Sequence, residues 1–326
     1  MKKIKTIGVL TSGGDAPGMN AAIRAVVRTA TYHGCDVVGI QCGFTGLLQN
    51  LFIPLQNHSV AQKISLGGTF LKSSRCPEFK TKKARSTAWQ NIQRQRIDAL
   101  VVIGGDGSFR GADLLGKEFG LPVIGIPGTI DNDIFGTDYT IGFDTAVNTA
   151  VQAVDKLRDT ADSHNMVFFV EVMGRDAGFI ALNTSISTGA EATLIPEVQT
   201  DIDKLCEYLE LERRKNKTSG IIIVAEGEEQ GSATVVAAKV KEKLPNYETR
   251  VTILGHIQRG GAPTANDRML ASILGHDAVV ALLEGKTGMM VGTVNNQTVF
   301  TPFHEAYSRH CKINKRWVNI AYILSL

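Results

Sequence analysis

The sequence predicts a doubly wound α/β fold. Short apolar runs rich in β-branched residues recur six times along the chain, and each is followed by a polar, glycine-rich segment. Runs of this kind are typical of buried parallel strands when helices separate them. Stretches of helical composition do lie between the runs, and strands that alternate with helices form a parallel sheet covered on both faces. Because the carboxyl ends of such strands line a crevice, we expect the six polar segments to build one large polar site.

The six apolar runs occupy residues 7–10, 100–103, 123–126, 167–172, 221–225 and 251–254. The segments that follow them read, in the same order, TSGGDAPG, GGDGS, PGTIDND, MGRDAG, EG and GHIQRGG. The stretches expected to be helical are residues 19–31, 82–96, 111–119, 145–159, 202–215, 235–244 and 267–283. Six purely structural turns would not need this density of Asp, Glu, Arg and His beside glycine, so the pattern favours a functional site.

Composition narrows the class of protein. The chain has 326 residues and a net charge of +3. The length predicts about two domains, and so small a charge gives no indication of a nucleic-acid partner. There is no apolar run of about 18 residues that would span a membrane, the amino terminus lacks the apolar stretch of a signal peptide, and the short apolar tail at 318–326 is expected to pack on a core. The five cysteines form no CxxC pair, which fits a reducing compartment, and we expect a cytoplasmic protein.

The segment at residues 127–133 carries the strongest chemical signal. It places Thr129, Asp131 and Asp133 directly after a predicted buried strand. Carboxylates two residues apart share one side of an extended backbone, so one could take a proton while the other orients a neighbour or a metal. A turn that caps a helix would explain the same residues equally well.

Two other segments suit phosphate. Glycines at 13–14 and 104–107 let the backbone approach phosphate oxygens closely, and the helix expected from Met19 offers its positive end to an anion. Asp106 among these glycines indicates a divalent cation, because a bare carboxylate would repel phosphate. Familiar nucleotide motifs are missing: Gly285-Lys286-Thr287 lacks the leading glycine of a P-loop, and no GxGxxG follows the first strand.

Four arginines are candidates for binding phosphate groups. Arg75, Arg175, Arg250 and Arg259 each lie in a glycine-rich segment or near a strand end, and guanidinium groups bind phosphate through two hydrogen bonds at once. Taken singly, each arginine is more typical of a surface ion pair than of a binding site. His256 taken singly is more typical of a structural histidine than of a catalytic one. Together they exceed what one nucleotide needs, which indicates a phosphorylated substrate as well.

Phosphoryl transfer needs a base for the attacking hydroxyl, a metal and positive charge. Our candidates are Asp131 as the base, Asp106 as the metal ligand, and Arg175 and Arg75 as stabilisers of developing charge.

These motifs together resemble those of bacterial ATP-dependent 6-phosphofructokinases. The resemblance runs essentially end to end, from GVLTSGGDAPGMN at residues 8–20 to NNQ at 295–297, and its most specific parts are PGTIDND, EVMGR at 171–175 and GHIQRGG. It implies a homotetramer whose subunits have two Rossmann-like three-layer lobes with mostly parallel sheets and an active site in the cleft between them. The implied reaction transfers a phosphoryl group from Mg-ATP to the 1-hydroxyl of fructose 6-phosphate, a step of glycolysis.

The resemblance also assigns regions and residues. It implies an ATP-binding lobe of residues 1–142 plus 258–308 and a sugar-phosphate-binding lobe of residues 143–257 plus 309–326. ATP and magnesium would be bound by Gly14, Arg75, Cys76, Gly105, Asp106, Gly107 and Ser108. The sugar phosphate would be bound by Thr129, Ile130, Asp131, Met173, Gly174, Arg175, Glu226, Arg250, His256 and Arg259. Of all these, Asp131, Thr129, Arg175, Gly14 and Arg75 would take part in the reaction itself.

A regulatory site between subunits is implied as well. Its residues would be Arg24, Arg28, Arg158, Glu191, Lys215 and Lys217, and its effectors would be ADP or phosphoenolpyruvate. Arg24 and Arg28 are one helical turn apart and face the same way, which suits an anion, although an exposed basic stripe would look the same.

Two departures bear on substrates. Pyrophosphate-using relatives carry larger residues where this chain has Gly107 and Gly128, and glycine leaves room for the rest of a nucleotide, so ATP is favoured as the donor. Met166 replaces an arginine that the family directs to a neighbouring subunit's sugar phosphate, and such a loss costs roughly 2–4 kcal/mol of affinity. The alternatives are therefore a non-catalytic or low-affinity regulatory paralogue, or a kinase for a different sugar phosphate.

Overall fold

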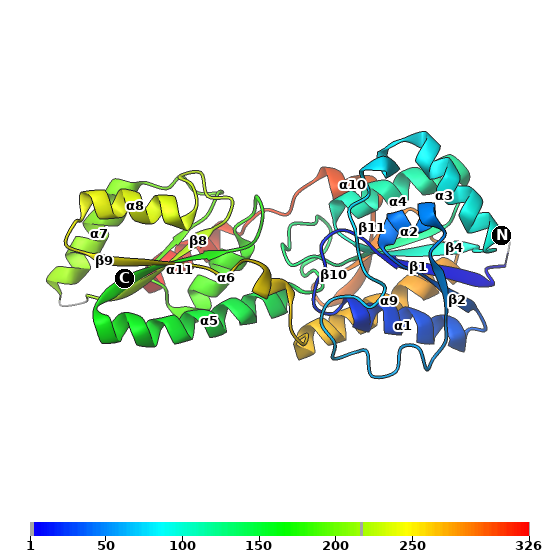
Figure 1. Cartoon of the computed structure of the whole chain (residues 1–326), viewed down its shortest axis with the longest axis horizontal. Helices are drawn as coiled ribbons and strands as arrows, with labels where there is room; N and C mark the ends of the chain where they lie inside the picture. Colours follow the sequence, from blue (N-terminus) through cyan, green and yellow to red (C-terminus); the bar gives the residue numbers. More distant parts are fainter. Residues whose placement is uncertain (1–2, 216–217, 326) are drawn as a thin grey trace. The chain divides into compact units, whose positions relative to one another are not determined.

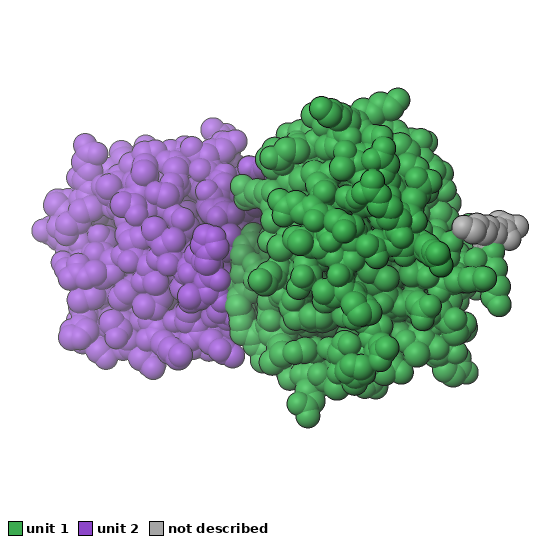
Figure 2. All heavy atoms as spheres, turned by 45° about the vertical axis from the view of Figure 1, so that its right-hand side comes forward, with its two compact units in different colours: residues 1–130, 134–145, 259–311 green, residues 131–133, 146–258, 312–326 purple. Residues whose placement is uncertain are grey.

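The computed structural model describes residues 3–215 and 218–325 of the chain, which separates into two compact units. Unit 1 comprises Met1–Ile130, Ile134–Thr145 and Arg259–Cys311, and unit 2 comprises Asp131–Asp133, Ala146–Gln258 and Lys312–Leu326 (Figure 2). The chain therefore passes between the units five times, and neither unit is a continuous piece of sequence.

Unit 1 is built on a seven-stranded sheet. Its five central strands run parallel, and each edge strand runs antiparallel to its neighbour. In order across the sheet the strands are β11 (Gln297–Pro302), β10 (Met289–Val294), β5 (Val123–Pro127), β4 (Ala99–Gly104), β1 (Thr6–Thr11), β2 (Asp36–Ile40) and β3 (Phe52–Leu55). Pro54 lies in the edge strand β3, where a residue without an N–H does least harm to the ladder.

Helices cover both faces of this sheet (Figure 1). One face carries α1 (Met19–Tyr32) and α9 (Ala265–Leu283), which pack on each other along their length. The other carries α2 (Gly43–Gln49), α3 (Lys82–Arg94), α4 (Asp106–Phe119) and α10 (Phe303–Ser308), with a short 3₁₀ turn at Pro77–Lys80. Helix α4 begins at Asp106, so the prediction of a helix from residue 111 was wrong at this end: the GGDGS segment is the start of the helix and not a loop before it.

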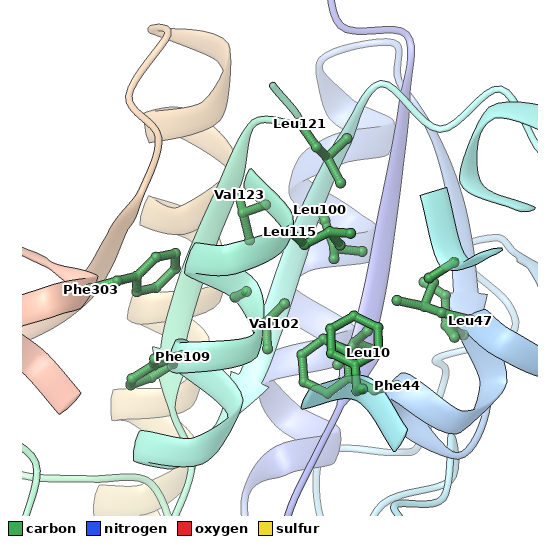
Figure 3. Packing of buried hydrophobic residues seen from close by; sticks show 14 of the residues in the cluster. Leu10, Phe44, Leu47, Leu100, Val102, Phe109, Leu115, Leu121, Val123 and Phe303 are labelled. Carbon is green, nitrogen blue, oxygen red and sulfur yellow. The ribbon is translucent and has the colours of Figure 1, made fainter. Parts of the chain in front are cut away.

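The hydrophobic core on the α4 side of the unit 1 sheet holds the helices on that side against the strands (Figure 3). Leu10, Leu100 and Val102 from β1 and β4 are fully buried beneath Leu115 of α4. The rings of Phe109 and Phe303 stack with their centroids 5.5 Å apart. Each buried side chain of this size contributes about 1.5–3 kcal/mol, so α4 and α10 are firmly fixed to the sheet.

Unit 2 has a smaller sheet of four strands, all parallel. Their order is β7 (Ala192–Leu194), β8 (Gly220–Ala225), β6 (Met166–Val172) and β9 (Glu248–Ile253). The packing helices are α5 (Phe143–His164), α6 (Phe179–Thr188), α7 (Ile202–Arg214), α8 (Ala233–Lys243) and α11 (Lys315–Ser325), and a 3₁₀ turn covers Gly255–Arg259 (Figure 1).

The two mostly parallel sheets confirm the predicted α/β class.

The apolar tail forms most of α11, which contacts α6 and β7 through a face that buries Ala321. The hydroxyl of Tyr208 donates to the carbonyl of Ser325 at 2.5 Å, and its burial raises the pKa of Tyr208 to about 12. Within the described residues, no helix is both long and apolar enough to cross a bilayer.

Candidate active site

Three strand ends meet at one edge of the unit 1 sheet. The N–H of Ser12, after β1, donates to the carbonyl of Ile103 in β4 at 2.9 Å, and the N–H of Gly128, after β5, donates to the carbonyl of Gly104 at 3.0 Å. The segments TSGGDAPG, GGDGS and PGTIDND therefore lie side by side, as expected for neighbouring parallel strands.

Two glycines of the GGDGS segment have opposite surroundings. A Cβ placed on Gly104 would lie 2.5 Å from the Ser108 Oγ and 2.5 Å from the carbonyl oxygen of Ser12, so no side chain fits there. A Cβ placed on Gly107 would meet nothing within 4 Å. The backbone is thus crowded where the strands join and open at the first turn of α4, where N–H groups can reach a ligand.

The residues present fit a magnesium ion that arrives with a nucleotide. Asp106 lies in the first turn of α4, at the end of β4. No group of three or more His, Cys, Asp or Glu side chains within residues 3–215 and 218–325 is arranged to hold a metal ion. Mg²⁺ typically takes one or two carboxylates and completes its shell with substrate phosphates and water, so a single aspartate in the glycine-rich first turn of α4 suits it.

The PGTIDND segment is held by residues 140–141, and Gly128 and Ile141 form an isolated β-bridge. The N–H of Ile141 donates to the carbonyl of Pro127 at 2.9 Å, and Oγ1 of Thr140 donates to the carbonyl of Thr129 at 2.6 Å. Asp131 is only 3% exposed, and the side chain of Ile130 is fully buried, so a ligand would meet Ile130 through its backbone. The segment is a fixed, partly buried structure and not a mobile loop tip.

Arg259 lies against the first glycine-rich segment. Its Nη1 donates to the carbonyl of Asp15 at 3.2 Å, and a Cβ on Gly14 would lie 2.6 Å from the same nitrogen. With a side chain at position 14, this guanidinium would have to move away from the backbone. Arg75 and His256 are exposed, and Cys76 is half-buried with its thiol 3.7 Å from Oε2 of Glu78.

In unit 2, a carboxylate and an amide organise the MGR segment after β6. Oε1 of Glu226 accepts hydrogen bonds from the N–H groups of Gly174 at 3.2 Å and Arg175 at 2.6 Å. Oε1 of the wholly buried Gln258 accepts from the N–H of Met173 at 3.0 Å. Arg175 adopts a left-handed backbone with φ of 54°, and its N–H is held by the Glu226 carboxylate while the residue is exposed.

Met166 lies at the start of β6, directly opposite Glu248 in the β6–β9 register. Arg250 follows two residues later on β9, on the same side of the sheet, and its Nη1 is 2.5 Å from Oε1 of Glu248. The position where the resemblance expects a second arginine is thus occupied by an uncharged side chain beside an Arg–Glu pair.

The residues expected at a regulatory site fall into separate groups. Arg158 donates to Oε1 of Glu191 at 3.2 Å and to the carbonyl of Thr188 at 3.0 Å in unit 2. Lys215 pairs with Glu212 at 2.8 Å. On α1 of unit 1, burial and the nearby charge of Arg28 lower the pKa of Arg24, in keeping with two guanidinium groups on one helix face. Lys217 lies outside the described residues.

Two buried polar residues near these segments had no place in the sequence-based prediction. Gln258 lies inside the GHIQRGG motif, but the sequence predicted no role for it. Its side-chain amide oxygen accepts a hydrogen bond from the N–H of Met173 and so holds the MGR segment. Asp267 is 1% exposed and accepts three hydrogen bonds from residues 142–145. Its signal in the sequence was only a charged residue three positions after Thr264 at the start of a predicted helix.

Comparison with known proteins identifies the family. The phosphofructokinase family model matches residues 6–282. "ATP-dependent 6-phosphofructokinase 2" of Bacteroides thetaiotaomicron is 52% identical over 326 residues, covering 100% of both chains. "ATP-dependent 6-phosphofructokinase 1" of Thermus thermophilus is 53% identical over 323 residues, covering 99% of this chain and 100% of that relative.

Solved structures agree with the sequence relatives. The phosphofructokinase of Saccharomyces cerevisiae superposes with a TM-score of 0.89 at 38% identity, covering 98% of this chain and 46% of that chain. A pyrophosphate-dependent phosphofructokinase of Marinobacter aquaeolei, at 23% identity and a TM-score of 0.86 over 96% of this chain and 86% of that one, shares the fold. The chain therefore belongs to the phosphofructokinase family.

Proposed function

We propose that this chain is an ATP-dependent 6-phosphofructokinase, which phosphorylates fructose 6-phosphate to fructose 1,6-bisphosphate in glycolysis. The observation that carries the proposal is the meeting of three strand ends in unit 1, which places two glycine-rich segments and the PGTIDND segment side by side. Relatives of that name are about half identical to this chain over essentially its whole length.

The reaction assigns distinct tasks to the described residues. Asp131 accepts the proton of the sugar 1-hydroxyl while the hydroxyl oxygen bonds to the γ-phosphorus of ATP. The bond between that phosphorus and the oxygen that bridges it to ADP breaks, and ADP leaves. Arg175 and Arg75 stabilise the negative charge that develops on the transferred group, and Thr129 and the backbone at Gly14 orient the reactants. Asp106 would hold a magnesium ion, which when bound would neutralise charge on the phosphates.

The two units divide the binding between them in this proposal. Unit 1 binds ATP through Gly14, Arg75, Cys76, Gly105, Asp106, Gly107 and Ser108. The sugar phosphate is bound by Thr129, Ile130, Asp131, Met173, Gly174, Arg175, Glu226, Arg250, His256 and Arg259, most of which lie in unit 2. Glu226 is already occupied in part by two backbone N–H groups, so we assign it to holding Arg175 as well as to the sugar.

ATP is favoured over pyrophosphate as the donor by the surroundings of two glycines. A Cβ on Gly128 would lie 3.0 Å from Cγ2 of Ile103 and 3.1 Å from Cε of Met19, so this position has little room for the larger residue of the pyrophosphate-using relatives. Gly107 faces open space, which leaves room for a nucleotide.

The wider arrangement belongs to the same proposal: a cytoplasmic homotetramer regulated by ADP or phosphoenolpyruvate. The Arg158–Glu191 pair, Lys215 and the two arginines of α1 would contribute to the effector site. Initial rates measured with and without each effector test this part, and the mass of the protein in solution tests the tetramer.

A coupled spectrophotometric assay with ATP, Mg²⁺ and fructose 6-phosphate tests the main proposal. We expect turnover that Asp131→Ala reduces by about 10²–10⁴-fold, the usual contribution of a general base. No turnover at millimolar substrate would refute the assignment.

Met166 favours a second candidate, a regulatory paralogue that binds sugar phosphate without turning it over. The two candidates separate on the same assay, because only the kinase shows activity that depends on Asp131. A panel of other sugar phosphates distinguishes a kinase with a different acceptor.

A further inference from the structure

Asp267 is a buried carboxylate with an unusual set of partners. It lies in the first turn of α9 and is 1% exposed. One oxygen accepts from the N–H of Gly142 at 2.7 Å, and the other accepts from the N–H of Thr145 at 2.8 Å and from its hydroxyl at 2.5 Å. Asp267 thus caps the start of α5, a helix that begins more than a hundred residues earlier in the sequence.

The starts of α5 and α9 are hydrogen-bonded to each other through Thr264, the N-cap residue of α9. Oγ1 of Thr264 accepts from the N–H of Asp267 at 3.3 Å, and donates to Oδ2 of Asp144 at 2.5 Å. The N–H of Thr264 donates to Oγ1 of Thr145 at 3.1 Å. Side chains from both helix starts therefore form one connected set of hydrogen bonds, which fixes residues 142–145 relative to α9.

Residues 140–142, which lead directly into this fixed stretch, contact the proposed site on two sides. On one side, Thr140 and Ile141 donate to the carbonyls of Thr129 and Pro127. On the other side, a Cβ on Gly142 would lie 2.6 Å from the Cβ of Ala16 and 3.2 Å from Cδ of Pro17.

Gly18 at the end of the first glycine-rich segment is equally close. A Cβ placed there would lie 2.6 Å from Cγ2 of Ile141 and 3.5 Å from the carbonyl oxygen of Asp267. Residues 140–142 are thus in contact with both the segment that carries Asp131 and the segment proposed to bind phosphate.

We propose that Asp267 is a positioning residue for phosphoryl transfer: by holding residues 142–145 it sets the place of the Thr129–Asp131 segment relative to the first glycine-rich loop. This inference rests on the proposed kinase function. It gives the buried carboxylate a part beyond capping a helix, because its hydrogen bonds also hold Gly142, and the two residues before Gly142 donate to the backbone that precedes Asp131.

The chemistry requires a carboxylate at this position. Three donors point at Asp267, and a carboxylate is the side chain that only accepts hydrogen bonds. Burial raises the pKa of Asp267, while the three donors oppose that rise. Asparagine has nearly the same shape, but its NH₂ group would face donors on one side, so residues 142–145 would have to shift.

The test is Asp267→Asn in the full chain, assayed well below its unfolding temperature. We expect kcat to fall about 10–100-fold, as for a displacement near 1 Å at a reacting group, with KM for ATP changed less than about threefold. The matched control is Asp201→Asn, the same substitution at the cap of α7, where the carboxylate accepts from the N–H groups of Asp203 and Lys204. It should leave kcat unchanged.

A double-mutant cycle tests the route. Thr140→Val removes the hydrogen bond to the Thr129 carbonyl, and its effect on kcat should be smaller in the Asp267→Asn background than in the wild type. If the fold-changes in kcat of the two single variants multiply to give the fold-change of the double variant, the two residues act independently and the route through residue 140 is wrong. Wild-type kcat in folded Asp267→Asn would overturn the proposal.

Amide hydrogen exchange provides a readout independent of activity. Asp267→Asn should speed exchange at residues 128–131 and 140–142, whereas Asp201→Asn should not. If the wild type proves inactive on fructose 6-phosphate, the kinase assignment fails, but this exchange pattern still decides whether Asp267 holds the segment. Should Asp267→Asn not fold, Thr145→Val removes one of the three donors and should change exchange and kcat in the same direction to a smaller degree; no change in either would contradict the inference.

Discussion

Replacing Gly104 by alanine tests whether the crowded strand ends matter for ATP. The new Cβ would lie 2.5 Å from both Oγ of Ser108 and the carbonyl oxygen of Ser12, where carbon and oxygen normally keep about 3.3 Å. The Ser108 hydroxyl can rotate away, but the Ser12 oxygen belongs to a backbone that is tied to Ile103 by a hydrogen bond. The ends of β1 and β4 must therefore separate by roughly 0.8 Å.

The cost follows from this displacement. Overpacking of this kind costs about 1–3 kcal/mol in unfolding free energy. Each kcal/mol lowers the Tm of a domain of this size by about 2–4 °C. Because the two glycine-rich segments are pushed apart at the same time, kcat/KM for ATP should fall about 100-fold.

Gly107→Ala is the matched control, three residues further along the same segment. Its Cβ has nothing within 4 Å and lies in the first turn of α4, so we expect Tm to stay or to rise, since alanine is favoured over glycine in a helix by about 0.5–1 kcal/mol. If ATP occupies this open space, KM for ATP will rise although stability does not fall.

Thermal unfolding followed by circular dichroism and coupled kinetics give both quantities for each variant. Wild-type Tm and kinetics for Gly104→Ala, or a larger loss of stability for Gly107→Ala than for Gly104→Ala, would refute the reasoning.

Three further predictions concern charge. Arg85 donates to both oxygens of Glu118 at 2.6 and 2.8 Å and lowers the pKa of that carboxyl, so the pair stabilises the fold above the ordinary carboxyl pKa of 4.5 and loses this contribution as pH falls through the lowered value. The wild type should exceed Glu118→Gln by about 1–3 kcal/mol in urea unfolding at neutral pH, and the difference should shrink in acid; a constant difference would contradict this. Met166→Arg places a cation opposite Glu248 and should lower KM for fructose 6-phosphate about tenfold or more, whereas an unchanged or higher KM would mean that the site is built around Met166. Asp106→Asn should raise the Mg²⁺ concentration for half-maximal rate at least about tenfold, and superimposable Mg²⁺ titrations for the two proteins would exclude Asp106 as a ligand.

The strands that carry the site could be predicted from the sequence because they are continuous apolar runs that end at glycine. Strands β1, β4, β5, β6 and β8 lie within one or two residues of the prediction, while β9 begins three residues earlier. Strands β2, β3 and β7 were missed, since β3 contains Pro54 and β7 has only three residues. The hairpin of β10 and β11 was missed although it had a signal: Asn295 and Asn296 both adopt positive φ, as in the tight turns that asparagine favours.

The site was predictable where it follows strands and unpredictable where it depends on distant contacts. The segments at residues 11–18, 104–108 and 127–133 lie together because parallel strands bring their ends together. The approach of Arg259 to Gly14 and Asp15 joins positions some 240 residues apart, and no local pattern encodes it. Asp267 was missed for the same reason, since its partners are more than 120 residues away.

The interleaved path of the chain between the two units affects the order in which they can fold during synthesis on the ribosome. Residues 146–258 are continuous and hold all four strands of the unit 2 sheet, so that sheet can form as soon as they emerge. The unit 1 sheet is begun first but completed after the unit 2 sheet: β10, the neighbour of β5, and α9, which packs on α1, are made only after residue 259. While more than a hundred further residues are synthesised, the first 145 residues have not yet received β10 beside β5 or α9 on α1. Uncovered apolar surfaces and unpaired strand edges of this kind are prone to aggregation, so an early stop in synthesis after residue 145 should leave an aggregation-prone fragment.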